Sequence, residues 1–148
     1  MRAACPFLAL GSGAIIAGGL VAAIQAHQPV PVLVWMSAYL VLIAGAAQVV
    51  FGAGQAWLSE RPPTAVWIAA EWLVFNLGNA GVIAGTLYDR FAVVLAGTLL
   101  FAAGIALFLL GTRGGTRRAW RVGYRVLLGL IFLSSLVGLA LSVQARMH

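Results

Sequence analysis

The sequence predicts an all-α fold, a polytopic bundle of transmembrane helices built as a single domain over residues 1–148. Composition is the first reason, because 63% of the residues are hydrophobic, only 8% are charged and the mean hydropathy is +1.04. A soluble domain is roughly one-quarter charged. The second reason is that the apolar residues extend along the whole chain and leave no stretch for a separate soluble module.

Five apolar segments each reach the roughly 20 residues that a helix needs to cross the hydrocarbon layer. They cover about residues 7–26, 32–58, 65–87, 91–112 and 122–144. We expect helices because lipid offers no partners to free backbone groups, and the sequence lacks the alternating pattern of a membrane barrel. The sequence therefore predicts five spans.

The breaks between the apolar segments have the composition of turns. Residues 27–31 and 59–63 each contain two prolines, which end one helix and can open the next. Residues 89–90 leave room only for a tight connection, and residues 111–116 form a fourth connection beside several arginines.

The charge of the chain is strongly basic, with a formal net charge of +6. Such a charge suggests nucleic acid in a soluble protein, but here more than half of the basic residues lie in or beside the fourth connection: Arg113, Arg117, Arg118, Arg121 and Arg125. Cytoplasmic loops of membrane proteins collect positive charge in this way. We therefore expect no nucleic-acid partner.

The same rule orients the chain. Arg2, Arg61 and the arginine-rich connection fall on one side of a five-span bundle, whereas the other side carries Arg90 beside Asp89, and Arg146. We expect the N-terminus in the cytoplasm and the C-terminus outside. The abundance of Ala, Gly, Val and Leu without Lys is typical of a GC-rich genome, and we expect a multi-pass protein of a bacterial inner membrane.

Glu71 is the single acidic residue within the apolar segments. An ionisable side chain in a span costs roughly 2.5–3.5 kcal/mol on insertion scales, so its presence is a functional hypothesis. It lies six residues inside the third span, about 9 Å from the cytoplasmic end at 1.5 Å per residue. Water reaches a side chain at that depth.

Amide side chains near this depth suggest a candidate site. The third span also carries Asn76 and Asn79, which share one helix face, and the second span offers Gln48 and Gln55 at depths on either side of Glu71. One hypothesis is a substrate or proton site at which the carboxyl exchanges its proton for a solute. The alternative is that Glu71 is structural and that the amides tie helices together by hydrogen bonds.

Arginines at the start of the last span form a second candidate site. Arg117, Arg121 and Arg125 recur every four residues, beside Trp120, and would form one stripe if the helix begins early. Such a stripe can hold anionic lipid headgroups at about 1 kcal/mol per arginine. Positive-inside topology explains the same residues without a specific lipid.

Small residues repeat on single faces of the predicted helices. Gly81 and Gly85 do so in the third span, and Gly97, Gly104 and Gly111 in the fourth. Helices approach closely at such positions in lipid. We expect packing within the bundle, with a dimer interface as the alternative.

The sequence lacks the residues that most enzymatic mechanisms need. The chain has two histidines, neither within a span, and one cysteine, which argues against bis-histidine haem and a cysteine-based metal cluster. We find no zinc-protease or nucleophile-elbow motif and no paired membrane carboxylates. We expect no catalytic residues, no metal and no cofactor.

Two functions remain. The first is a non-catalytic accessory subunit or helper of a larger membrane complex, with the bilayer and a membrane-protein partner or a second copy as its neighbours. The alternative is a proton- or cation-coupled small-solute transporter organised around Glu71.

Overall fold

The computed structural model describes residues 2–59, 63–112 and 118–144, and within these ranges every regular element is a helix. Five helical segments are long and apolar enough to cross a membrane. The prediction of an all-α bundle with five spans is therefore confirmed.

The helix boundaries lie within a few residues of those predicted. A short 3-10 turn, η1 (Arg2–Ala4), leads into the first span, α1 (Cys5–Ile24). The second span is one continuous helix, composed of α2 (Pro31–Tyr39), η2 (Leu40–Ala47) and α3 (Gln48–Leu58). The remaining spans are α4 (Ala65–Leu87), α5 (Phe91–Gly111) and α6 (Arg118–Gln144).

Two boundaries differ from the prediction for identifiable reasons. The first helix ends at Ile24 rather than residue 26, because the chain turns before the prolines that follow. The last helix begins at Arg118 rather than residue 122, so its arginines are helical. A helix of 27 residues is about 40 Å long, which exceeds the roughly 30 Å of hydrocarbon and lets the basic first turns extend beyond it.

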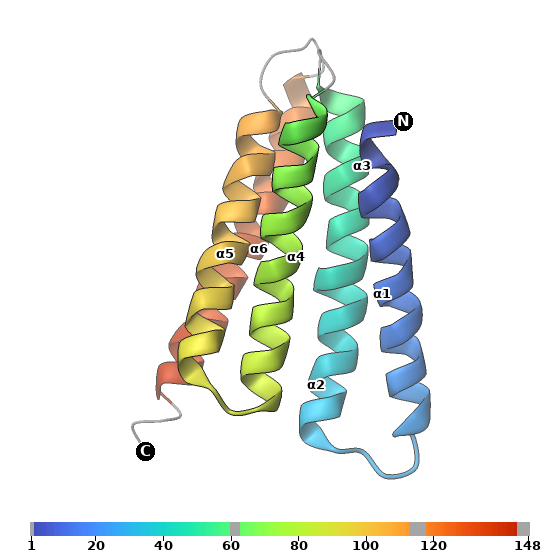
Figure 1. Cartoon of the computed structure of the whole chain (residues 1–148), viewed down its shortest axis with the longest axis vertical. Coiled ribbons are helices and arrows are strands. Elements are labelled where there is room, and N and C mark those ends of the chain that lie inside the picture. Colours follow the sequence, from blue (N-terminus) through green and yellow to red (C-terminus); the bar gives the residue numbers. More distant parts are fainter. Residues whose placement is uncertain (1, 60–62, 113–117, 145–148) are drawn as a thin grey trace.

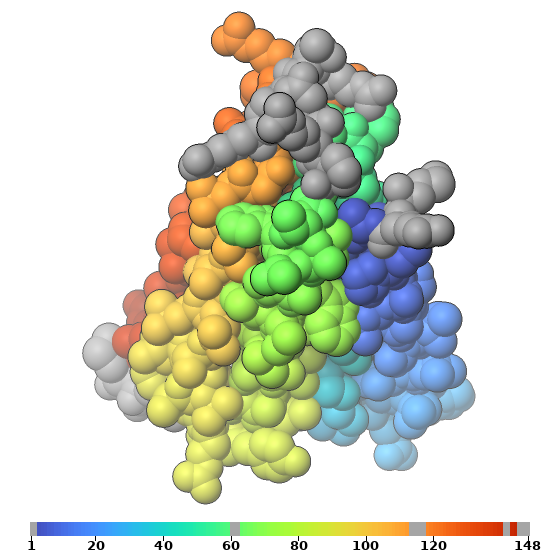
Figure 2. Space-filling model, turned by 45° about the horizontal axis from the view of Figure 1, so that its top comes forward, coloured from blue at the N-terminus to red at the C-terminus, as the bar shows by residue number. Residues whose placement is uncertain are grey.

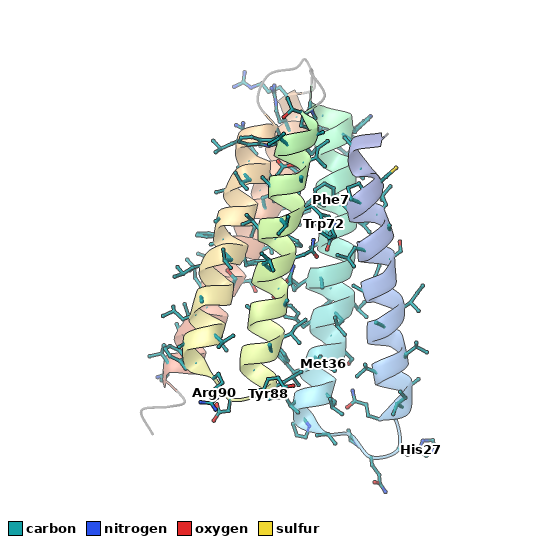
Figure 3. All side chains as sticks on the ribbon, in the orientation of Figure 1. Phe7, His27, Met36, Trp72, Tyr88 and Arg90 are labelled. Carbon is teal, nitrogen blue, oxygen red and sulfur yellow. The ribbon has the colours of Figure 1, made fainter. Side chains whose placement is uncertain are left out.

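The spans run alternately up and down, and the ends of α3 and α5 and the starts of α4 and α6 lie at the same end as the start of α1 (Figure 1). The C-terminus and the connections from α1 to α2 and from α4 to α5 lie at the opposite end. Below we call these the N-terminal end and the C-terminal end of the bundle. His27 and Arg90 mark the C-terminal end (Figure 3).

Glycines set how closely the helices approach. A Cβ atom placed on Gly81 would lie 2.8 Å from the Gly97 Cα, and one on Gly85 would lie 2.5 Å from the Val94 N. Gly104 packs on the Phe75 backbone in the same way, with 3.0 Å to its Cα. The expected role of these glycines in packing within the bundle is confirmed.

A cluster of aromatic side chains fills the interior between the helix pairs. Phe51 lies at its centre, with its ring 5.7 Å from that of Phe75 and 5.4 Å from that of Phe108. Phe7 reaches the cluster from α1 by packing over Gly52 and against Phe108. In lipid, where the surroundings are as apolar as the interior, such contacts stabilise the bundle by dispersion and ring geometry.

The second span is widened at η2, where the backbone takes the π-helical form. Gly45 lies in this segment, and its Cβ position would be 2.5 Å from the side chain of Ile15 on α1. Short π segments often occur near functional sites. Here the widened turn is the surface against which α1 packs.

Helix α6 is the least embedded of the five spans. It packs against α5 and α3, and Tyr124 anchors it by donating a hydrogen bond from its hydroxyl to the Phe51 carbonyl oxygen at 3.0 Å. The Trp120 and Trp57 rings meet edge to face at 5.4 Å near the N-terminal end. Most of its remaining surface is exposed.

Candidate functional site

The Glu71 carboxyl is fully buried, and its residue lies in the second turn of α4. Its Oε1 accepts two hydrogen bonds, from Gln55 Nε2 at 2.5 Å and from Trp67 Nε1 at 2.6 Å. The first bond joins α3 to α4, and the second stays within α4 across one helical turn. The carboxyl is therefore a link between two spans.

The start of α4 positions these groups. The Thr64 hydroxyl oxygen caps the helix by accepting from the Trp67 backbone N at 3.2 Å. Helical spacing then places Trp67 and Glu71 on one face, since residues four apart are neighbours. Gln55 reaches them because α3 and α4 run antiparallel, a register also reported by the contact between Phe51 and Phe75.

The end of α5 covers the carboxyl. Gly111 lies directly over it, since a Cβ on Gly111 would meet Gln55 Nε2 and would lie 2.9 Å from Glu71 Oε1. The Gly111 carbonyl oxygen accepts from the Ser59 hydroxyl at 3.2 Å. The Thr112 carbonyl oxygen accepts from the Arg125 guanidinium at 3.4 Å. The end of α5 thus covers the carboxyl, and hydrogen bonds from Ser59 and Arg125 hold that end in place.

The second carboxylate oxygen of Glu71 is in a different situation from the first. Among the residues that the structure describes, no group forms a hydrogen bond with Oε2, although the atom is buried. A buried oxygen left in this state costs free energy whether the carboxyl is charged or protonated. The position is suited to a proton, a cation or a water molecule that bridges to it.

Gln48 is also buried and unsatisfied. It is fully inaccessible, and within the described ranges neither its Oε1 nor its Nε2 has a hydrogen-bond partner. It precedes Gln55 by seven residues on the same helix face, about 10 Å further into the bundle. Trp72 Nε1, at the level of Phe7 in Figure 3, is a third buried group without a described partner.

Asn79 and Asn76 are placed apart from Glu71. The Asn79 Oδ1 accepts a hydrogen bond from the Tyr39 hydroxyl at 2.9 Å, which links α4 to α2. Asn79 lies eight residues beyond Glu71, about 12 Å along the helix. The Asn76 Nδ2 donates to the Trp72 carbonyl oxygen on its own helix at 2.7 Å. The five polar residues therefore lie at several depths, and Gln55 is the member that contacts Glu71.

Three further residues take part in these contacts, and the sequence analysis did not predict that they would: Trp67, Gly111 and Tyr39. Trp67 had a signal, because it precedes Glu71 by four residues on one helix face. The sequence held no signal for the contacts of Gly111 with Glu71 and of Tyr39 with Asn79, because each joins residues 40 positions apart along the chain.

The arginine stripe is only partly described. Arg117 lies outside the described residues, while Arg121 and Arg125 lie on α6. Arg118, at the start of the helix, lies within about 60° of both around the helix axis, at 3.6 residues per turn. Trp120 projects from another side and contacts Trp57. On the described part of α6, the arginines that share one side are therefore Arg118, Arg121 and Arg125.

The open surface of the N-terminal end includes a shallow hollow between α1 and α4. Figure 2 shows the first turns of α1 (blue) beside the start of α4 (green). Ala3, Pro6, Ile68 and Trp72 are among the residues that line it. It does not reach Glu71.

Comparisons with models of protein families, with curated proteins and with solved structures find no match to this chain.

Proposed function

We propose that this multi-pass membrane protein is a non-catalytic accessory subunit that docks a transmembrane helix of a partner against α6. The observation that carries the proposal is an exposed apolar stripe on α6: Val122, Val126, Gly129, Leu133 and Leu136. These residues follow one another at intervals of four and three, the spacing at which two helices interlock side chains along a seam.

Gly129 gives this stripe a site of close approach. A Cβ at this position would meet no atom within 4 Å, so α6 offers bare backbone to the outside at the middle of the stripe. In lipid, close approach at small residues is a main source of helix association. The glycines between α4 and α5 are used in this way within the bundle, and Gly129 provides the same feature toward a partner.

The test is purification of the tagged full chain from its own membranes in mild detergent, with Gly129→Ile as the variant. Gly13→Ile is the matched control, because a Cβ on Gly13 of α1 also meets nothing within 4 Å. We expect a partner in stoichiometric amount, retained by Gly13→Ile and reduced at least tenfold by Gly129→Ile. Failure to recover any stoichiometric partner, or equal recovery with both variants, would count against the proposal.

A second candidate function is a proton- or cation-coupled small-solute transporter. The observation in its favour is the buried Glu71 Oε2 without a described partner. The test is carbodiimide labelling of Glu71 in liposomes across a range of pH, with Glu71→Gln as the control. This function predicts labelling that changes with pH and is blocked by a solute or a cation. Labelling that no solute or cation affects would leave Glu71 as a structural residue.

Anionic lipid is the partner that we propose for Arg118, Arg121 and Arg125. The three arginines lie on the first turns of α6, on one side of the helix, and arginines near a membrane surface attract anionic headgroups. Arg125 also holds the end of α5, so Arg118 is the better site for substitution. Replacing Arg118 with Gln is expected to weaken binding of phosphatidylglycerol by about fivefold, the effect of about 1 kcal/mol per arginine, measured by native mass spectrometry.

Orientation and location complete the proposal. We place the N-terminal end of the bundle in the cytoplasm of a bacterial cell, because the arginine-rich connection joins helices at that end.

A further inference from the structure

A cavity of about 330 Å³ lies between α2, α4, α5 and α6 in the half of the bundle toward the C-terminal end. This is the half that contains Met36 and Tyr88 (Figure 3). A volume of this size is at the lower end of the range for small-molecule sites. The cavity is separate from Glu71, which is not among its lining residues.

The walls of the cavity differ in character. Helices α2 and α5 contribute the aromatic side chains of Trp35, Tyr39 and Phe101. The Trp35 and Tyr39 rings lie 5.1 Å apart at an angle of 32°, and form a nearly continuous aromatic surface. Helix α6 contributes the small residues Ser134, Ser135 and Gly138. A space between an aromatic wall and a wall of small residues suits a flat molecule, because a flat ring can stack on the aromatic side chains within a narrow gap.

Hydroxyl groups line the cavity and offer mostly acceptors. Thr86, Thr98 and Ser135 donate their hydroxyl hydrogens to carbonyl oxygens of their own helices, at 2.8, 2.9 and 2.7 Å. Each oxygen keeps lone pairs that can accept a further hydrogen bond. Ser134 forms no hydrogen bond within the described part of the chain, so it is able to donate as well. An acyl chain would satisfy none of these groups.

The cavity is reached from the bilayer. Helix α6 packs against α5 and α3, and it makes no extensive contact with α2. The lining residues begin near the membrane surface, at Thr86 and Val94 beside the tight turn, and continue to Phe101 about 10 Å deeper along α5. A ligand that enters between α2 and α6 arrives through the lipid and is itself soluble in lipid.

We propose that this cavity binds a membrane-soluble molecule with a flat ring that carries oxygen substituents, the chemistry of a quinone or phenol head group. The ring lies against Trp35 and Tyr39, and one of its oxygen atoms accepts a hydrogen bond from the Ser134 hydroxyl. A phenol or quinol hydroxyl can in addition donate to the oxygens of Thr86 and Thr98, which have already given their own hydrogens to carbonyl groups. This inference does not depend on the proposed docking face of α6 or on Glu71.

The test uses the full chain in lipid nanodiscs and decylubiquinone as the probe, with bound probe measured by native mass spectrometry across a titration. Decanol is the matched compound, since it has the same tail and no ring. Gly138→Leu fills the cavity, because a Cβ on Gly138 meets no atom within 4 Å. Gly123→Leu is the control on the same helix, since its Cβ is equally open and it lies outside the cavity.

We expect saturable binding of one decylubiquinone per chain, and binding of decanol at least tenfold weaker. Gly138→Leu should weaken decylubiquinone at least tenfold while Gly123→Leu changes it less than twofold. Ser134→Ala should weaken it about fivefold, the effect of one neutral hydrogen bond. Binding that does not saturate, or equal affinity for decanol, would overturn the proposal. Should Gly138→Leu fail to assemble, an unchanged affinity of Ser134→Ala would also overturn it.

Discussion

At the scale of single residues, Glu71 is the buried carboxyl that links two spans. It lies in a fully buried position with two donors on Oε1 and no described partner on Oε2. The two donors belong to Gln55, which is buried, and to Trp67, which is half-buried. The carboxyl oxygen therefore satisfies both donors at once, and this role is separable from its charge.

Substitutions at Glu71 can distinguish the acceptor from the charge. Glu71→Ala leaves Gln55 Nε2 and Trp67 Nε1 without an acceptor, and we expect it to lower the free energy of unfolding by about 2 kcal/mol. Glu71→Gln keeps a carbonyl oxygen, so its loss should stay below about 1 kcal/mol. Unfolding of the purified protein by titration with SDS in mixed micelles measures both. Equal losses would show that the charge, and not the acceptor, stabilises the link.

The rarity of an acid in an apolar segment pointed to Glu71, and its pairing with Gln55 follows from the antiparallel order of the spans. The partner of Asn79 and the lack of a described partner for Gln48 were not predictable, because they depend on the rotation of each helix about its own axis. Tyr39 illustrates this limit, since its contact with Asn79 exists only after α2 and α4 have packed.

At the scale of helices, the apolar runs and their prolines predicted all five spans because length and backbone satisfaction leave few alternatives in lipid. The π-helical segment η2 had no such signature, because it arises where Gly45 of that segment packs against α1. The turn after α4 was expected to be tight. It is closed by a hydrogen bond from the Arg90 N to the Gly85 carbonyl oxygen at 2.7 Å, with Asp89 at a φ of 50°.

The contact of α4 with α5 should be the most sensitive to added volume. A Cβ on Gly97 would lie 2.5 Å from the Val82 N, and that backbone atom has no flexible end to move aside. We expect Gly97→Ala to lower the free energy of unfolding by about 1–3 kcal/mol. Gly19→Ala on α1, where a Cβ meets nothing within 4 Å, should be close to neutral. Thermal unfolding in detergent followed by circular dichroism compares them, and similar midpoints for the two variants would contradict the packing.

At the scale of the whole molecule, four spans pack closely as two pairs, α1 with the second span and α4 with α5. Helix α6 lies across α5 and α3, held by Tyr124 and by the contact of Trp120 with Trp57. This arrangement leaves an apolar stripe on α6 and a cavity behind it. Both features involve the fifth span, which is the least buried of the five.

The orientation of the bundle is tested with single cysteines in a Cys5→Ser background. His27 and Thr64 lie at opposite ends, and both are exposed. If the arginine-rich end faces the cytoplasm, an impermeant maleimide added to intact spheroplasts will label His27→Cys and will not label Thr64→Cys until the membrane is opened. The reverse pattern would place the N-terminal end outside.

The central claim is that α6 contacts a partner helix in the membrane, and photo-crosslinking in native membranes tests it most directly. A photoreactive residue is placed at Leu133 in the stripe or, as a control, at Ile16 on α1, which is equally exposed to lipid. We predict that Leu133 gives one adduct of defined mass with another membrane protein or with a second copy, and that Ile16 gives lipid adducts only. Lipid adducts alone from both positions would contradict the account.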